Sequence, residues 1–141
     1  MALARAAARR EKEQKKKDEQ KTSRVQVTVI QPGDAFNFPK TGDSVSIHYI
    51  TELEDGTVID NSYKRGQPLN IILGAGHVIP GWEEVIPNMS KGEKSRIIVP
   101  PALAYGDNGY PPIIPPNAKL IFEIELLSLS SQSYQERTKR G

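Results

Sequence analysis

Apolar and polar residues alternate with a period of two in several parts of the chain, which predicts β-strands. The alternating segments are residues 25–29 (VQVTV), 44–49 (SVSIHY), 69–73 (LNIIL) and 120–126 (LIFEIEL), and residues 94–99 (KSRIIV) also favour a strand. In the segment at 120–126, glutamates alternate with the apolar residues, as in a strand with one face in water. The sequences at 32–34 (PGD) and 54–56 (EDG) indicate turns between strands.

One short helix is expected at residues 80–86 (PGWEEVI). Pro80 suits the first turn of a helix, where its missing N–H is not needed, and Pro87 limits how far the helix can run. A sheet with one apolar face needs a cover, and Trp82 is the obvious side chain to provide it. The expected fold class is therefore α+β, an antiparallel sheet of about five strands with one short helix against one face.

Residues 100–119 show no regular pattern and contain six of the eleven prolines. An irregular segment of about 20 residues is uncommon in a compact domain unless it is functional. Proline restricts φ, so such a segment can be held in place with little secondary structure. Because apolar Tyr105, Tyr110, Ile113 and Ile114 lie in it, we expect it to form a wall over an apolar cleft.

The net charge of +2 combines basic ends with an acidic middle. Residues 1–24 hold nine Lys/Arg and four Asp/Glu, residues 131–141 hold three and one, and residues 25–130 hold seven and twelve. A folded part with a net charge of −5 would repel nucleic acid, so we do not expect it to bind DNA or RNA. The predicted organisation is a basic solvated or helical extension (1–23), one folded domain (24–130) and a flexible basic tail (131–141).

The basic extension bears on where the protein is located. Lys15, Lys16 and Lys17 leave a weak nuclear signal open, or a tether to an acidic surface. Organelle import is a weaker alternative, because three arginines precede the first acidic residue. No apolar run approaches the roughly 18 residues of a membrane helix, so membrane insertion is not expected.

Several kinds of chemistry have no residues to support them. The chain has no cysteine, and its two histidines, His48 and His77, are not in a metal-ligand spacing. There is no phosphate-binding loop, no nucleophile elbow and no zinc-protease motif. The sequence therefore predicts no cofactor, no metal and no covalent nucleophile.

Eight short segments, in this order and spacing, resemble the FKBP-type peptidyl-prolyl cis-trans isomerases, the macrolide-binding immunophilins. They are residues 45–49 (VSIHY), 53–57 (LEDGT), 59–62 (IDNS), 78–84 (VIPGWEE), 89–92 (MSKG), 104–106 (AYG), 113–118 (IIPPNA) and 120–127 (LIFEIELL). The likeness runs from about residue 25 to 129 and is strongest to the small, single-domain cytosolic members, so it implies a cytoplasmic location. It implies a five-stranded twisted antiparallel sheet wrapped on the helix.

The resemblance also implies an apolar pocket with catalytic and ligand-binding residues. The catalytic set would be Asp60, Tyr105, Trp82 and Phe122. The substrate- or macrolide-binding set would be Tyr49, Ile59, Leu69, Val78, Ile79, Tyr110, Ile113 and Ile114. The chain departs from the best-known small members in having Ile59 and Leu69 in place of Phe, and His77 where an acidic residue is frequent. These changes are expected to shift the peptide preference and to weaken macrolide affinity.

The function implied by the resemblance is cis–trans isomerisation of X-Pro bonds in peptides and folding proteins. Tacrolimus and rapamycin would bind in the same pocket, and the drug-loaded protein would present a composite surface to calcineurin or to the TOR kinase. The alternative is a binding module that holds a proline-containing segment of a partner without turnover being its purpose. A monomer is the expected state.

Overall fold

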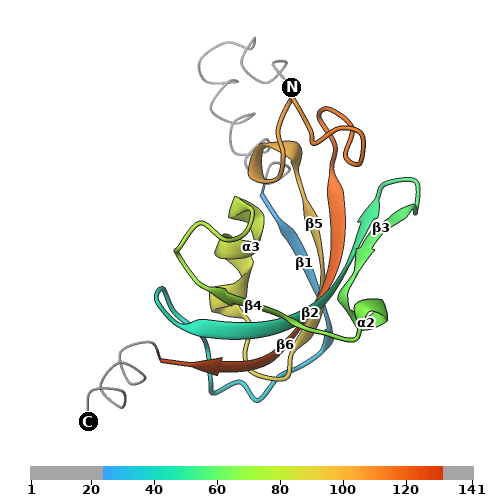
Figure 1. Ribbon diagram of the computed structural model, residues 1–141. Helices are drawn as coiled ribbons and strands as arrows, with labels where there is room; N and C mark the ends of the chain where they lie inside the picture. Colours follow the sequence, from blue (N-terminus) through green and yellow to red (C-terminus); the bar gives the residue numbers. More distant parts are fainter. Residues whose placement is uncertain (1–23, 132–141) are drawn as a thin grey trace, which may run out of the picture.

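Residues 24–131, which the computed structural model describes, form a strongly bent antiparallel sheet with a short helix in the bend (Figure 1). The strands are β1 (Gln26–Gln31), β2 (Ser44–Leu53), β3 (Val58–Asn61), β4 (Leu69–Ile72), β5 (Lys94–Val99) and β6 (Leu120–Ser130), and the helices are α2 (Ser62–Arg65) and α3 (Pro80–Val85). The strand order is β1-β5-β6-β2-β3, with β4 also paired to β2. The predicted antiparallel sheet with one short helix against one face is confirmed.

Strands β2 and β6 form the middle of the sheet and give the core its regular alternation. They pair over their whole length, from Ser44 opposite Ser130 to Leu53 opposite Leu120. Every second side chain is buried from Val45 to Thr51 in β2 and from Leu120 to Leu126 in β6, while the intervening ones are partly exposed. Since directly opposite residues share a face, the buried sets of β2 and β6 meet on the concave side of the sheet.

Strand β3 and helix α2 were not individually expected from the sequence. The 54–56 turn is present, with the Leu53 N–H donating to Thr57 O at 2.9 Å and Gly56 at a φ of 92°. It leads into β3, whose pairing with β2 shifts register after Thr51. Helix α2 follows at once, because the Asn61 side chain accepts from the Lys64 N–H and Gly66 ends the helix at a φ of 72°.

Helix α3 lies close to β5. It begins at Pro80 and ends at Val85, and a 3-10 turn containing Pro87 continues it from Ile86 to Asn88. A Cβ atom on Gly81 would lie 2.6 Å from Cγ1 of Val99. Glycine is therefore what lets the helix approach the sheet closely enough to bury Trp82, the next residue along the chain.

The proline-rich segment at 100–119 is held by its own backbone. The Asn117 N–H donates to Gly106 O at 2.9 Å, and the Tyr110 N–H donates to Ile114 O at 2.8 Å. Apart from a 3-10 turn at Pro101–Leu103, it contains no helix or strand longer than an isolated bridge. This agrees with the expectation of an ordered segment with little regular secondary structure.

The predicted extension at 1–23 and nearly all of the predicted tail at 131–141 lie outside the described residues, so those predictions remain untested. Within residues 24–131, no helix is long and apolar enough to cross a membrane.

Candidate active site

A pocket of about 290 Å³ opens on the concave side of the sheet. Its lining comes from β2, β3, β4, β6, the first turn of α3, the segment before α3 and the proline-rich segment. The lining residues are Tyr49, Thr51, Ile59, Asp60, Leu69, His77, Val78, Ile79, Trp82, Tyr105, Tyr110, Ile113, Ile114, Leu120 and Phe122. The structure thus brings all twelve predicted site residues together, while their individual roles remain predictions.

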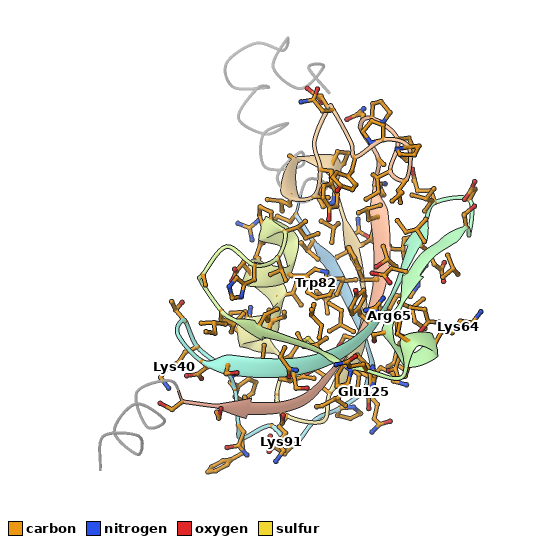
Figure 2. The ribbon with its side chains drawn as sticks, viewed as in Figure 1. Lys40, Lys64, Arg65, Trp82, Lys91 and Glu125 are labelled. Atoms are coloured by element: carbon orange, nitrogen blue, oxygen red, sulfur yellow. The ribbon has the colours of Figure 1, made fainter. Side chains whose placement is uncertain are left out.

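Three aromatic rings form the deepest part of this lining. Trp82 is 4% exposed and lies between α3 and the sheet (Figure 2). Its ring meets those of Tyr49 and Phe122 edge to face, with centroids 5.1 and 5.2 Å apart. This is the favoured geometry for aromatic pairs, so the three rings fix one another. The result is a rigid apolar surface at the base of the pocket.

One donor in this base has no partner. The indole Nε1 of Trp82 is buried and makes no hydrogen bond with any residue in 24–131. Such orphaned donors are rare because their burial costs free energy. Trp82 therefore sits where it does because of ring packing, not because of a polar anchor.

A polar cluster lies at one wall of the pocket. The Tyr49 hydroxyl donates to Oδ2 of Asp60 at 2.5 Å, and Arg65 from α2 donates to Oδ1 of Asp60 and, at 3.1 Å, to the Tyr49 hydroxyl. The Arg65 guanidinium also lies over the Tyr49 ring, 5.6 Å from its centroid. Burial, and then the hydrogen bond to Asp60, raise the pKa of Tyr49, so its hydroxyl remains a donor. Asp60 is thus held in one orientation from two sides.

Ser62 connects this wall to the back of the sheet. It is fully buried, and its Oγ accepts from the Tyr49 N–H at 2.7 Å and lies 2.8 Å from Nδ1 of His48. On the far side, the His48 ring stacks on Tyr63, with centroids 4.4 Å apart. The short helix α2 therefore contributes Arg65, which holds the wall residues Asp60 and Tyr49, and Tyr63 on the opposite face.

The rim of the pocket is aromatic and partly exposed. Tyr105 and Tyr110 are 41% and 59% exposed, and their ring centroids are 5.9 Å apart. Burial, and then the neighbouring Tyr110 and Asp60, raise the pKa of Tyr105. None of the hydrogen bonds found within residues 24–131 uses the Tyr105 hydroxyl or the Ile79 N–H. Both groups are free to bind a carbonyl oxygen.

The structure adds four residues that the sequence prediction did not include in the site. Thr51 and Leu120 continue the buried alternation of β2 and β6, so the period of two was the signal that could have found them. His77 lines the rim, and it was noted in the sequence only as a departure from a family pattern. Arg65 reaches Asp60 through the turn of α2, and no spacing rule would have revealed this contact.

Chemically, the pocket suits an apolar ring with carbonyl groups on either side. Its base and most of its walls are aromatic or aliphatic, and its polar groups stand at the edge. Among the described residues, no three His, Cys, Asp or Glu side chains are grouped so that they could hold a metal ion. Binding and orientation of an uncharged group are what this arrangement can do.

An aromatic-based pocket between a bent antiparallel sheet and a short helix defines a domain that binds an apolar ligand, with polar groups at the edge to orient it. The comparisons give the particular family: residues 36–127 match the FKBP-type peptidyl-prolyl cis-trans isomerases. The chain belongs to this family and is a peptidyl-prolyl cis-trans isomerase.

Individual relatives agree with this assignment. FK506-binding protein 1 of Kluyveromyces lactis is 49% identical over 106 residues, which is 75% of this chain and 93% of the relative. FK506-binding protein 1 of Saccharomyces cerevisiae is 48% identical with the same coverage. The crystal structure of AtFKBP13 superposes with a TM-score of 0.70 at 35% identity, covering 75% of this chain and 93% of that one.

Proposed function

We propose that the isomerase reaction takes place in this pocket and that its substrates are X-Pro bonds of peptides and folding proteins. The observation that carries the proposal is the convergence of the twelve predicted residues on one apolar cavity. The expected location of the activity is the cytoplasm.

An apolar pocket is sufficient in principle for this reaction. Resonance gives the peptide bond a rotation barrier of about 18–20 kcal/mol, and uncatalysed X-Pro bonds isomerise in tens to hundreds of seconds. At the twisted transition state the resonance is lost, so the carbonyl is less polar than in the planar amide. Water stabilises the planar form more than the twisted one. Transfer into the pocket removes that preference, and the barrier falls without a nucleophile.

The polar groups at the edge would orient the substrate. The Ile79 N–H and the Tyr105 hydroxyl would each donate a hydrogen bond to a carbonyl oxygen of the substrate. Asp60, at the pocket wall, would polarise or orient the X-Pro amide as it twists. Each hydrogen bond is worth roughly 1 kcal/mol net. Such bonds accelerate the reaction only to the extent that they are stronger in the twisted state.

The same pocket is proposed to bind tacrolimus and rapamycin. Support comes from the relatives, which carry the name FK506-binding protein. The proposed drug-loaded protein would present the proline-rich rim to calcineurin or the TOR kinase. Ile59 and Leu69 give two walls of the pocket aliphatic instead of aromatic side chains, so we expect weaker macrolide binding than in members with Phe there.

A protease-coupled assay of the full chain on a Leu-Pro peptide, with and without tacrolimus, tests both parts. Activity that one equivalent of tacrolimus abolishes supports the pocket as the site and as the drug receptor. Activity that tacrolimus leaves unchanged contradicts the drug proposal alone. A folded protein without activity contradicts the catalytic proposal and favours the binding module.

The site assignment is tested by Asp60→Val, with Asp107→Val as the matched control. Both remove an Asp, but Asp107 is exposed and lies outside the pocket lining. We expect kcat/KM to fall only in Asp60→Val. An equal fall in both variants would contradict a specific role for Asp60.

A further inference from the structure

The segment at 74–79, between β4 and α3, has few side chains that could hold it in place. Gly74, Ala75 and Gly76 carry at most a methyl group, and both glycines have a positive φ, 85° and 78°. These three residues and His77 are exposed. Yet the next two residues, Val78 and Ile79, line the pocket. Val78 and Ile79 pack against the core, and the Ile79 carbonyl accepts from the Trp82 and Glu83 N–H groups. The exposed part of the segment can therefore shift them only through the backbone that leads into them, and it is held by hydrogen bonds of its own.

Three such hydrogen bonds are present. The Ala75 N–H donates to Ile72 O at 3.3 Å, which closes the turn. The Gly74 N–H donates to Oε1 of Glu83 at 2.9 Å, which ties the start of the segment to α3. The Ile72 N–H, at the end of β4, donates to Nδ1 of His77 at 3.2 Å, which ties the end of the segment to the sheet.

The contact at His77 differs from the other two because it depends on protonation. A ring nitrogen of histidine accepts a hydrogen bond only when it carries no proton. The Ile72 N–H can only donate, so Nδ1 is the unprotonated nitrogen and the ring proton is on Nε2. Protonation of Nδ1 would place two donors against each other. The hydrogen bond to β4 would then break.

We propose that His77 is a positioning residue of the active site: its neutral ring fixes the segment that carries Val78 and Ile79, and its protonation releases that segment and lowers isomerase activity. This inference rests on the proposed function of the pocket. Its effect is indirect, since the ring acts on Ile79 through the backbone. The expected loss on acidification is roughly three- to ten-fold in kcat/KM, the size of one net hydrogen bond.

The charged and titratable groups around the rim do not replace this contact. They are Glu83 on α3, Asp60 on β3 with its partner Arg65 on α2, and the phenols of Tyr105 and Tyr110. Within residues 24–131, no ion pair or hydrogen bond joins any of them to His77. Among the described residues, the Ile72 N–H is therefore the one group to which the His77 ring is hydrogen-bonded.

The chain allows a sharp test because it contains two histidines, His77 and His48. We would measure kcat/KM of the full chain between pH 5.5 and 8 by NMR exchange on a Leu-Pro peptide, which needs no coupling protease. In His77→Asn, Oδ1 replaces Nδ1 as an acceptor that does not titrate, so activity should stay high at acidic pH. In His77→Phe the acceptor is absent, so activity should stay low at every pH.

The matched control is His48→Asn, which removes the other histidine ring and should keep the wild-type profile. A wild-type profile that is flat, or that persists in His77→Asn, overturns the proposal. A direct measurement on the wild-type protein avoids variants that fail to fold. The ¹⁵N shifts of the ring should show the proton on Nε2 of His77. The chemical shift of the Ile72 amide should change when the ring is protonated. A ring protonated on Nδ1 at neutral pH would also overturn it. Wild-type protein that is inactive at every pH would instead contradict the proposed function.

Discussion

Tyr49 and Asp60, eleven positions apart in the chain, are joined by a 2.5 Å hydrogen bond between neighbouring strands. Arg65 completes the cluster by donating to both. The side chains of Arg65 and Asp60 are 48% and 38% exposed, so this ion pair contributes little to stability. What the cluster provides is a carboxylate with a fixed direction at the pocket wall.

Removal of the Tyr49 hydroxyl should lower activity and stability alike, each by about the contribution of one hydrogen bond. In Tyr49→Phe the ring contact with Trp82 remains, but Asp60 loses one of its two side-chain partners. We expect a loss of about 1 kcal/mol in unfolding free energy and of roughly five-fold in kcat/KM. The matched control is Tyr63→Phe, which breaks another phenol–carboxylate bond, to Glu125 at 2.5 Å, outside the pocket. Equal losses of activity in both variants would contradict the orienting role.

Fluorescence should report directly on the pocket, because Trp82 is the only tryptophan of the chain. Indole emission depends on the polarity and the ring contacts around it, and Trp82 lines the cavity. A Leu-Pro peptide should change the emission in a saturable way, whereas the same peptide with Gly in place of Pro should not. Identical titrations with the two peptides would place proline binding elsewhere.

Gly81→Ala should destabilise the protein although alanine favours helix formation. Alanine gains at most about 1 kcal/mol in propensity over glycine. The new Cβ would lie 2.6 Å from Val99 Cγ1 and 3.3 Å from Leu103 O, and overpacking of this kind costs about 1–3 kcal/mol. Urea unfolding measures the net loss. Glu84→Ala, at an exposed position of the same helix, controls for general effects of substitution in α3.

Stability should depend on pH through Asp34. Its carboxylate accepts from the Asn37 and Phe36 N–H groups at 2.9 Å, and these bonds, that of Asn37 first, lower its pKa below the ordinary 3.8. A lowered folded pKa gives stability that is present above pH 3.8 and is lost as the pH falls through the folded value. The difference in unfolding free energy between wild type and Asp34→Asn should therefore shrink below pH 3.8. A difference that is constant down to pH 2 would show that the charge of Asp34 is irrelevant.

The sequence predicted the long elements of the fold well because burial there has a strict period. The alternation along β2 and β6 is visible in the residues themselves and reappears in their exposure. Strand β3 has only four residues and a register shift, which is too short for a period to show. Helix α2 likewise has four residues and depends on its Asn61 and Gly66 caps, so tertiary context decides it.

Site residues could be predicted where they lie in segments that resemble the family. Contacts between residues that only the folded chain brings together could not be predicted. Trp82 and Asp60 lie within matched segments, whereas the tie between His77 and the Ile72 N–H depends on how the chain turns between β4 and α3. A hydrogen bond between a side chain and a backbone group of another element produces no recognisable spacing of residues in the sequence. Residues that act through such hydrogen bonds can be identified only from the three-dimensional structure.

The position of β6 has a consequence for how the protein is made. Among the strands of residues 24–131, β6 comes last in sequence, yet it alone joins β1 and β5 to the group formed by β2, β3 and β4. Until Leu120–Ser130 has left the ribosome, a growing chain holds two separate sets of strands with uncovered apolar faces. Assembly of the sheet is therefore a late event in synthesis, and it is the emerging chain, more than the finished enzyme, that needs protection from aggregation.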